Sequence, residues 1–217
     1  SAPVKQEGAG VVFDTAGETF TARYTHDTIA LAFAITEEAI EDNLYDRLAA
    51  RYTRALARSM ANTKQVKAAN VLNNAQNTAF TGGDGKTLIN SAHPLATGGT
   101  FSNVLATAAD LNETSLEQSL IDIQAFVDER GLKIASQGVK MIIPKELQFT
   151  AERLMKSPQR TATADNDINA IASMGMVPQG YRVNNFLTDT DAFFLLTDVP
   201  NGLKMFVRSP IKTAMEG

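Results

Sequence analysis

The sequence predicts an α+β protein in which an extended arm, folded as a long hairpin, precedes a long helix and a series of short elements. Proline spacing is the first observation behind this class. The 217-residue chain has no proline between Pro3 and Pro94, so long uninterrupted elements are allowed there. From Pro144 onward prolines recur, and no repeated strand–helix order follows. The second half is therefore predicted to consist of short mixed elements.

Composition excludes several classes of protein. With 44% hydrophobic and 20% charged residues, the chain can bury a core. A net charge of −4 argues against a sequence-reading DNA-binding protein, which normally carries a basic surface. Two histidines and no cysteine exclude disulfide frameworks, zinc knuckles, iron–sulfur ligation and thiol catalysis. No apolar run approaches the ~20 residues of a membrane span, so no membrane partner is expected. No metal or cofactor is expected either.

Residues 10–35 predict a long two-stranded hairpin. Large apolar side chains alternate with small or polar ones, and Ala16-Gly17 provides a turn. Beyond a break at 26–28, large side chains occupy one face and alanines the other, as in a strand that packs on both sides. An isolated hairpin is marginal in water, so this one is expected to need a partner chain. The apolar residues predicted to contact that chain are Val11, Phe13, Phe20 and Tyr24.

Residues 37–76 predict a helix about 60 Å long. Thr36 is the expected N-cap, and acidic residues precede basic ones along the helix, an order that complements the helix dipole. Any interruption is expected near Asn62-Thr63. Four arginines share an arc of roughly 60° away from the apolar face, either as a solvated surface or as one that meets phosphates or an acidic neighbouring subunit. These subunit-interface candidates are Arg47, Arg51, Arg54 and Arg58.

The second half predicts alternating short elements. A capping box at 114–117 opens a helix that Gly131 ends, and a buried strand at 139–143 leads through Pro144 into a helix ending near Lys156. A polar loop follows at 159–167. The remaining predicted strands are 181–186, 192–196 and 203–207.

The sequence contains no convincing catalytic motif. The Gly82–Thr87 turn ends in Gly-Lys-Thr, but Phe80 stands where a phosphate loop needs glycine, so a glycine-rich surface turn is predicted. Ser91 and His93 lack a nucleophile elbow and an oxyanion site, and His93 is expected to make a local hydrogen bond.

Metal-binding patterns are equally weak. His26 has no ligand-like spacing to another candidate, and Asp189-Thr190-Asp191 is better explained as a turn than as a hard-cation site. The predicted catalytic, cofactor-binding and metal residues are therefore none.

Four segments in order nevertheless resemble the major capsid proteins of tailed bacteriophages. Residues 32–75 resemble the end of the extended loop and the spine helix in the run AFAITEEAIEDNLYDRLAARYTRALARSMANTKQVKAANVLNNA. Residues 84–94, DGKTLINSAHP, with GGTFSN just after them, are similar to the loop that follows the spine helix in these capsid proteins. The next helix, strand and helix of these proteins resemble SLEQSL at 115–120 and MIIPKELQFTAERLMKS at 141–157. A strand pair of their A-domain resembles VNNFLTDTDAFFLLTD at 183–198.

This resemblance implies the Hong Kong ninety-seven-like (Johnson) capsid fold. Its parts would be an N-terminal arm at 1–9, an E-loop hairpin at 10–35, a P-domain at 36–140 that includes the spine helix 37–76, and an A-domain at 141–217. Such proteins usually continue with strands that return to the P-domain, so C-terminal return strands are expected beyond Gly217.

The implied function is that of a major capsid (major head) protein and not of an enzyme. Copies would self-assemble as hexamers and pentamers into an icosahedral head in the virion, built in the host bacterial cytoplasm. Double-stranded DNA would be enclosed by non-specific contact, with portal, scaffold and decoration proteins as further partners. Two alternatives stay open: an encapsulin-type nanocompartment shell, and a small nucleotide-binding enzyme or hydrolase that uses the 82–87 turn.

Overall fold

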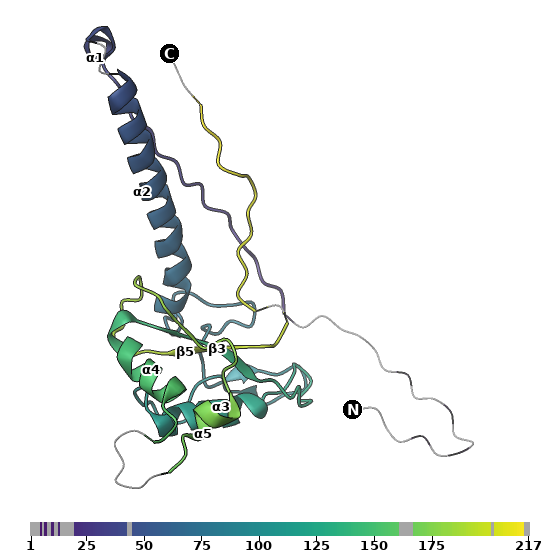
Figure 1. Ribbon diagram of the computed structural model, residues 1–217. Coiled ribbons are helices and arrows are strands. Elements are labelled where there is room, and N and C mark those ends of the chain that lie inside the picture. The colour runs from purple at the N-terminus through teal and green to yellow at the C-terminus, as the bar shows by residue number, and fades with distance from the viewer. Residues whose placement is uncertain are drawn as a thin grey trace.

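A computed structural model describes residues 5, 7, 10, 13, 20–42, 45–160, 167–200 and 202–214, excluding the side chains of Ile40 and residues 45–48. Figure 1 shows a body of short elements from which a long helix projects. Two extended stretches run beside that helix: the N-terminal segment, residues 20–35, and the C-terminal segment, residues 202–214. The body comprises the described residues between 74 and 200.

The predicted spine helix forms as two helices, α1 (Glu37–Glu41) and α2 (Tyr45–Asn73). At 29 residues, α2 is about 44 Å long. It continues through 62–63, where the hydroxyl of Thr63 donates to the carbonyl of Ser59 at 3.1 Å, so no interruption occurs there. The helical path instead changes before Tyr45. Asn73 fixes the other end to the body through hydrogen bonds with the backbone of Phe186 and Thr188, both at 3.1 Å.

The N-terminal segment contains no strand, so the predicted strand at 29–35 is wrong. Its backbone N–H and C=O groups make no hydrogen bond to another described residue. The alternating side chains at 29–35 give this stretch two different faces, but a strand also needs a neighbouring segment with which to form hydrogen bonds. Most of the first predicted strand and its turn at 16–17 lie outside the described residues.

A three-stranded sheet forms the centre of the body. The central strand β3 (Gly138–Ile143), confirmed where the apolar run predicts it, pairs in parallel with β4 (Tyr181–Val183) and antiparallel with β5 (Phe194–Thr197). The connection from β3 to β4 carries η1 (Lys145–Leu147), α4 (Gln148–Lys156) and α5 (Ala170–Met174). Sequence analysis missed α5, although Asn169 caps it and Gly175 ends it with a φ of 63°. Residues 203–207, predicted as a strand, form none.

Helix α3 (Glu113–Gln124) differs from its prediction at both ends. Its capping box joins Asn112 and Ser115, at 2.9 and 3.0 Å, instead of Thr114 and Glu117. The helix ends at Gln124 because the chain then turns back, with a bridge between Val127 and Lys133. Gly131, with a φ of 78°, belongs to that turn and does not end the helix. A short antiparallel pair, β1 (His93–Pro94) and β2 (Thr100–Phe101), lies beside this turn.

The hydrophobic core is confined to the body. It forms where α3 and α4 cover β3, so the sheet and these helices stabilise one another. Among the α2 side chains that the structure describes, the buried apolar ones are Ala69 and Leu72, both near the C-terminal end. Most of α2 and both extended segments thus lie outside the core. The buried core residues are Leu111, Leu116, Leu120, Met141, Ile143, Ala151, Leu154, Ile171 and Val177.

Candidate assembly interface

Large apolar side chains along the two extended segments are left uncovered. Tyr24 is 71% exposed and Phe33 is 41% exposed, although both lie beside other aromatic rings. The ring of Tyr24 lies 5.3 Å from that of Phe206, and the ring of Phe33 lies 5.6 Å from that of Tyr52 on α2. The C-terminal segment adds further exposed side chains, namely Leu203, Met205, Phe206, Val207 and Ile211. Such a concentration of exposed apolar surface is typical of a protein–protein contact.

An open trough runs between α2 and the two extended segments. Its volume is about 3670 Å³, several times the roughly 300–1,000 Å³ of small-molecule pockets. Along α2 it is lined by apolar residues that include Leu56, Met60 and Val71. Its size and lining fit a chain segment better than a substrate.

Few polar contacts hold the N-terminal segment to α2. The ammonium group of Lys67 lies 2.5 Å from the carboxylate of Asp27, and both side chains are more than half exposed. This hydrogen bond is the main cause that lowers the pKa of Asp27. Exposed ion pairs of this kind contribute little to stability, so this contact holds the N-terminal segment against α2 only weakly.

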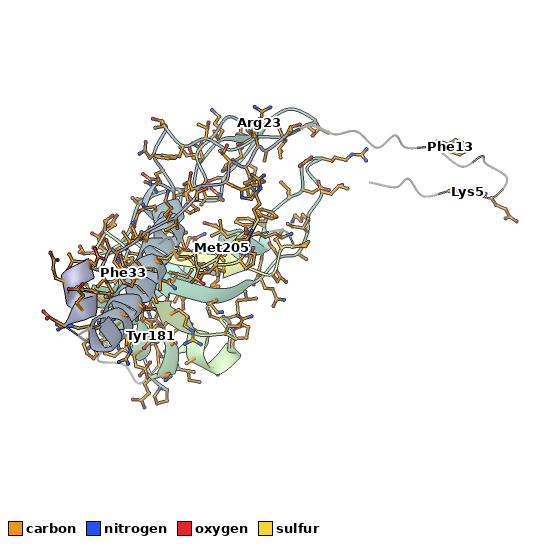
Figure 2. All side chains as sticks on the ribbon, turned by 90° about the horizontal axis from the view of Figure 1, so that it is seen from above. Lys5, Phe13, Arg23, Phe33, Tyr181 and Met205 are labelled. Atoms are coloured by element: carbon orange, nitrogen blue, oxygen red, sulfur yellow. The ribbon has the colours of Figure 1, made fainter. Side chains whose placement is uncertain are left out.

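The predicted interface residues fall in three places. Phe13 is 93% exposed and lies away from the body (Figure 2). Phe20 and Tyr24 belong to the N-terminal segment. The structure does not bring these aromatic residues onto the arginine stripe within one chain. Of the stripe, Arg51, Arg54 and Arg58 are exposed on α2. Val11 and the side chain of Arg47 lie outside the described residues.

The N-terminal segment begins on the glycine-rich turn at 81–87. A Cβ atom added to Gly83 would lie 2.8 Å from the carbonyl oxygen of Thr21 and 3.1 Å from the nitrogen of Ala22. Backbone therefore packs directly on backbone, and only glycine allows this approach. Sequence reasoning missed this role because nothing near Gly83 in the chain indicates what packs against it. No helix follows the turn, which argues against a phosphate loop.

Asp84, a residue of this turn, forms a close pair with His93. His93 Nδ1 lies 2.6 Å from Asp84 Oδ2, with the two side chains 18% and 19% exposed. Burial opposes ionisation of Asp84, but hydrogen bonds from His93 and the backbone N–H of Lys86 outweigh it and hold the pKa of the carboxyl below its usual value. The local hydrogen bond expected for His93 is confirmed.

This lowered pKa predicts a pH dependence of stability. A carboxyl whose pKa is lower when folded stabilises the protein above its unfolded pKa, and it loses this effect as the pH falls through the folded pKa. We expect wild type to melt at a higher temperature than Asp84→Asn at pH 7, and the difference to shrink below about pH 4. Thermal melts from pH 7 to pH 3 measure this, and a difference that stays constant contradicts it.

The described residues hold no group of three or more His, Cys, Asp or Glu side chains arranged to bind a metal. Asp189 and Asp191 form the predicted turn, in which the Asp191 N–H donates to the Asp189 carboxylate at 3.3 Å. A hydrogen bond between the two carboxyl groups lowers the pKa of Asp189 and raises that of Asp191. Within the described ranges, no helix has the length and apolar character to cross a membrane.

The fold and the uncovered surface define a structural subunit that presents more apolar side chains than its own chain covers. A family model described as phage capsid protein matches residues 18–215. The chain therefore belongs to the phage capsid protein family, and its place is in the virion. No curated protein and no solved structure matches it.

Proposed function

We propose that this chain is the major capsid protein of a tailed double-stranded DNA phage and that its copies assemble into the icosahedral head. The observation that carries the proposal, in a chain of the phage capsid family, is the N-terminal segment: Tyr24 is 71% exposed, and within the described residues the backbone of 20–35 makes no hydrogen bond. A contact that buries this backbone must supply its hydrogen-bond partners, and strand pairing with a neighbouring copy can do so.

The proposed fold is the Hong Kong ninety-seven-like one. Residues 1–9 would form the N-terminal arm and 10–35 the E-loop, with α2 as the spine of a P-domain that ends near 140. The sheet β4-β3-β5 with α4 and α5 would then be the A-domain. A mixed sheet on one side and a projecting helix on the other support this assignment.

In the proposed contact, the E-loop of one copy lies over α2 of the next. Phe13, Phe20 and Tyr24 of one copy, together with Val11, would enter the trough of its neighbour. Burying such a side chain contributes about 1.5–3 kcal/mol. A contact between two different surfaces closes into rings when the rotation permits, and such rings would be the hexamers and pentamers of the shell.

Expression of the chain followed by negative-stain microscopy and sedimentation tests the proposal. We expect closed particles of uniform diameter. Double-stranded DNA inside particles from infected cells would identify a phage head, whereas protein cargo without DNA would favour a nanocompartment shell. A stable monomer whose N-terminal segment resists proteolysis would contradict assembly through that segment.

The arginine stripe on α2 gives a separate prediction. Reversing Arg51, Arg54 and Arg58 to glutamate should reduce particle or genome yield at least ~10-fold, because like charges now face an acidic neighbour or the enclosed DNA. Particle counts and DNA content measure the effect. The control reverses three exposed cations of the body, Lys133, Lys145 and Arg182. Wild-type yields from the stripe variant, or equal losses in the control, would count against the stripe.

A further inference from the structure

The turn at 81–87 is rigid within itself. Its backbone is closed by hydrogen bonds from the Gly82 N–H to the Lys86 carbonyl at 2.7 Å and from the Gly85 N–H to the Gly82 carbonyl at 3.1 Å. A bridge between Thr81 and Thr87 joins its two sides. These bonds set the shape of the turn, but they do not set the direction in which its tip points from the body.

The Asp84–His93 pair is a further contact of this turn, and it reaches the body. His93 lies on β1 opposite Phe101 of β2, with the two rings 6.2 Å apart. Phe101 in turn packs edge-on against Phe126 at 4.8 Å. The imidazole is therefore held by the body, while the carboxylate belongs to the tip of the turn, and their 2.6 Å contact joins the two.

The pair differs from an ordinary surface ion pair. Asp84 also accepts from the Lys86 N–H at 3.0 Å, so its ionised carboxylate acts only as an acceptor and His93 Nδ1 must donate. His93 Nε2 is then buried without a partner among the described residues. Leaving a buried polar atom unpaired costs about 1–3 kcal/mol. Among the described residues, the hydrogen bond through Nδ1 is therefore the one that the imidazole makes.

We propose that the Asp84–His93 pair positions the 81–87 turn beneath the start of the N-terminal segment and so sets the direction in which that segment leaves the body. Gly83, next to Asp84, is the point of contact with Thr21 and Ala22. The purpose of this positioning rests on the proposed function, since a segment that must reach a neighbouring copy needs a defined direction. The positioning itself is a property of the single chain.

The test is His93→Phe, which keeps the ring packing against Phe101 and removes the donor. We expect the distance distribution between spin labels on cysteines introduced at positions 23 and 133 to shift and broaden in the dissociated chain, because the turn loses its link to the body. The melting temperature at pH 7 should fall as it does in Asp84→Asn, because both variants remove the same hydrogen bond. A histidine that only stabilises the body would lower the melting temperature in the same way but leave the distance distribution unchanged.

Two further variants make the test specific. Gly83→Ala leaves the pair intact but places a methyl group against the Thr21 backbone, so it should shift the same distance distribution as His93→Phe does. Lys86→Ala is the control, because its exposed side chain lies on the same turn outside the pair. An unchanged distance distribution in both His93→Phe and Gly83→Ala would overturn the proposal.

The shell gives an independent readout. If the wild-type chain forms particles, His93→Phe should yield fewer and less uniform ones. If the wild-type chain forms none, the proposed function fails, while the spin-label distances in the dissociated chain still decide whether the pair positions the segment.

Discussion

Replacing Phe20 and Tyr24 by aspartate is expected to abolish particle formation while the body remains folded. Both side chains lie outside the core, and the ring of Tyr24 contacts that of Phe206 on the C-terminal segment. Phe20 is 37% exposed and Tyr24 71% exposed, so both rings are expected to lose further exposed surface between copies. A carboxylate buried in that contact without a partner costs several kcal/mol, and the loss recurs at every contact of a closed shell.

Sedimentation velocity and negative-stain microscopy measure the effect, with circular dichroism melts to follow the body. Phe149→Asp is the matched control, because Phe149 is an aromatic residue on α4 that is 71% exposed, as Tyr24 is. Particle yield should fall to background in the double variant and persist in the control. Normal particles from the double variant, or unfolding of its body, would contradict an interface made by the N-terminal segment.

Leu116→Ala is expected to have the largest effect on folding. Leu116 on α3 is fully buried with Met141 and Ile143 of the central strand, so truncation leaves a cavity between helix and sheet. The free energy of unfolding should fall by about 2–5 kcal/mol. Urea denaturation followed by circular dichroism measures it.

Ile121→Ala on the same helix is the control, since Ile121 is 59% exposed. Its free energy of unfolding should change by less than about 0.5 kcal/mol. A loss below 1 kcal/mol for Leu116→Ala would mean that the body does not depend on the contact between α3 and β3. Together with the aspartate variant, this pair of measurements separates folding of the body from assembly of the shell.

Elements whose signals lie within a few adjacent residues could be predicted. The apolar run at 139–143 predicted β3, and the helix predicted from Pro144 to about Lys156 forms as η1 followed by α4, which ends at Lys156. The helical pattern after Tyr45 was also correct as far as Asn73. In each case the side-chain period and the flanking residues indicate the same structure, so no distant contact was needed to decide it.

Elements whose ends depend on distant contacts could not be predicted. Helix α3 stops at Gln124 because Phe126 leaves the helix to pack against Phe101 of β2. The segment 203–207 alternates like a strand but has no neighbour to pair with in the described chain. Strand pairing is a relation between two segments, and side-chain alternation describes only one of them.

The sequence by itself determined the mixed class, the long helix with its arginine stripe, and an N-terminal region whose apolar side chains lie outside the core. These follow from composition and periodicity, which act between near neighbours. Only the tertiary structure decided that Gly83 lies beneath Thr21 and that His93 holds Asp84. The reason is physical: a close approach of two backbones and a buried hydrogen bond exist only once packing has brought separate stretches of chain together.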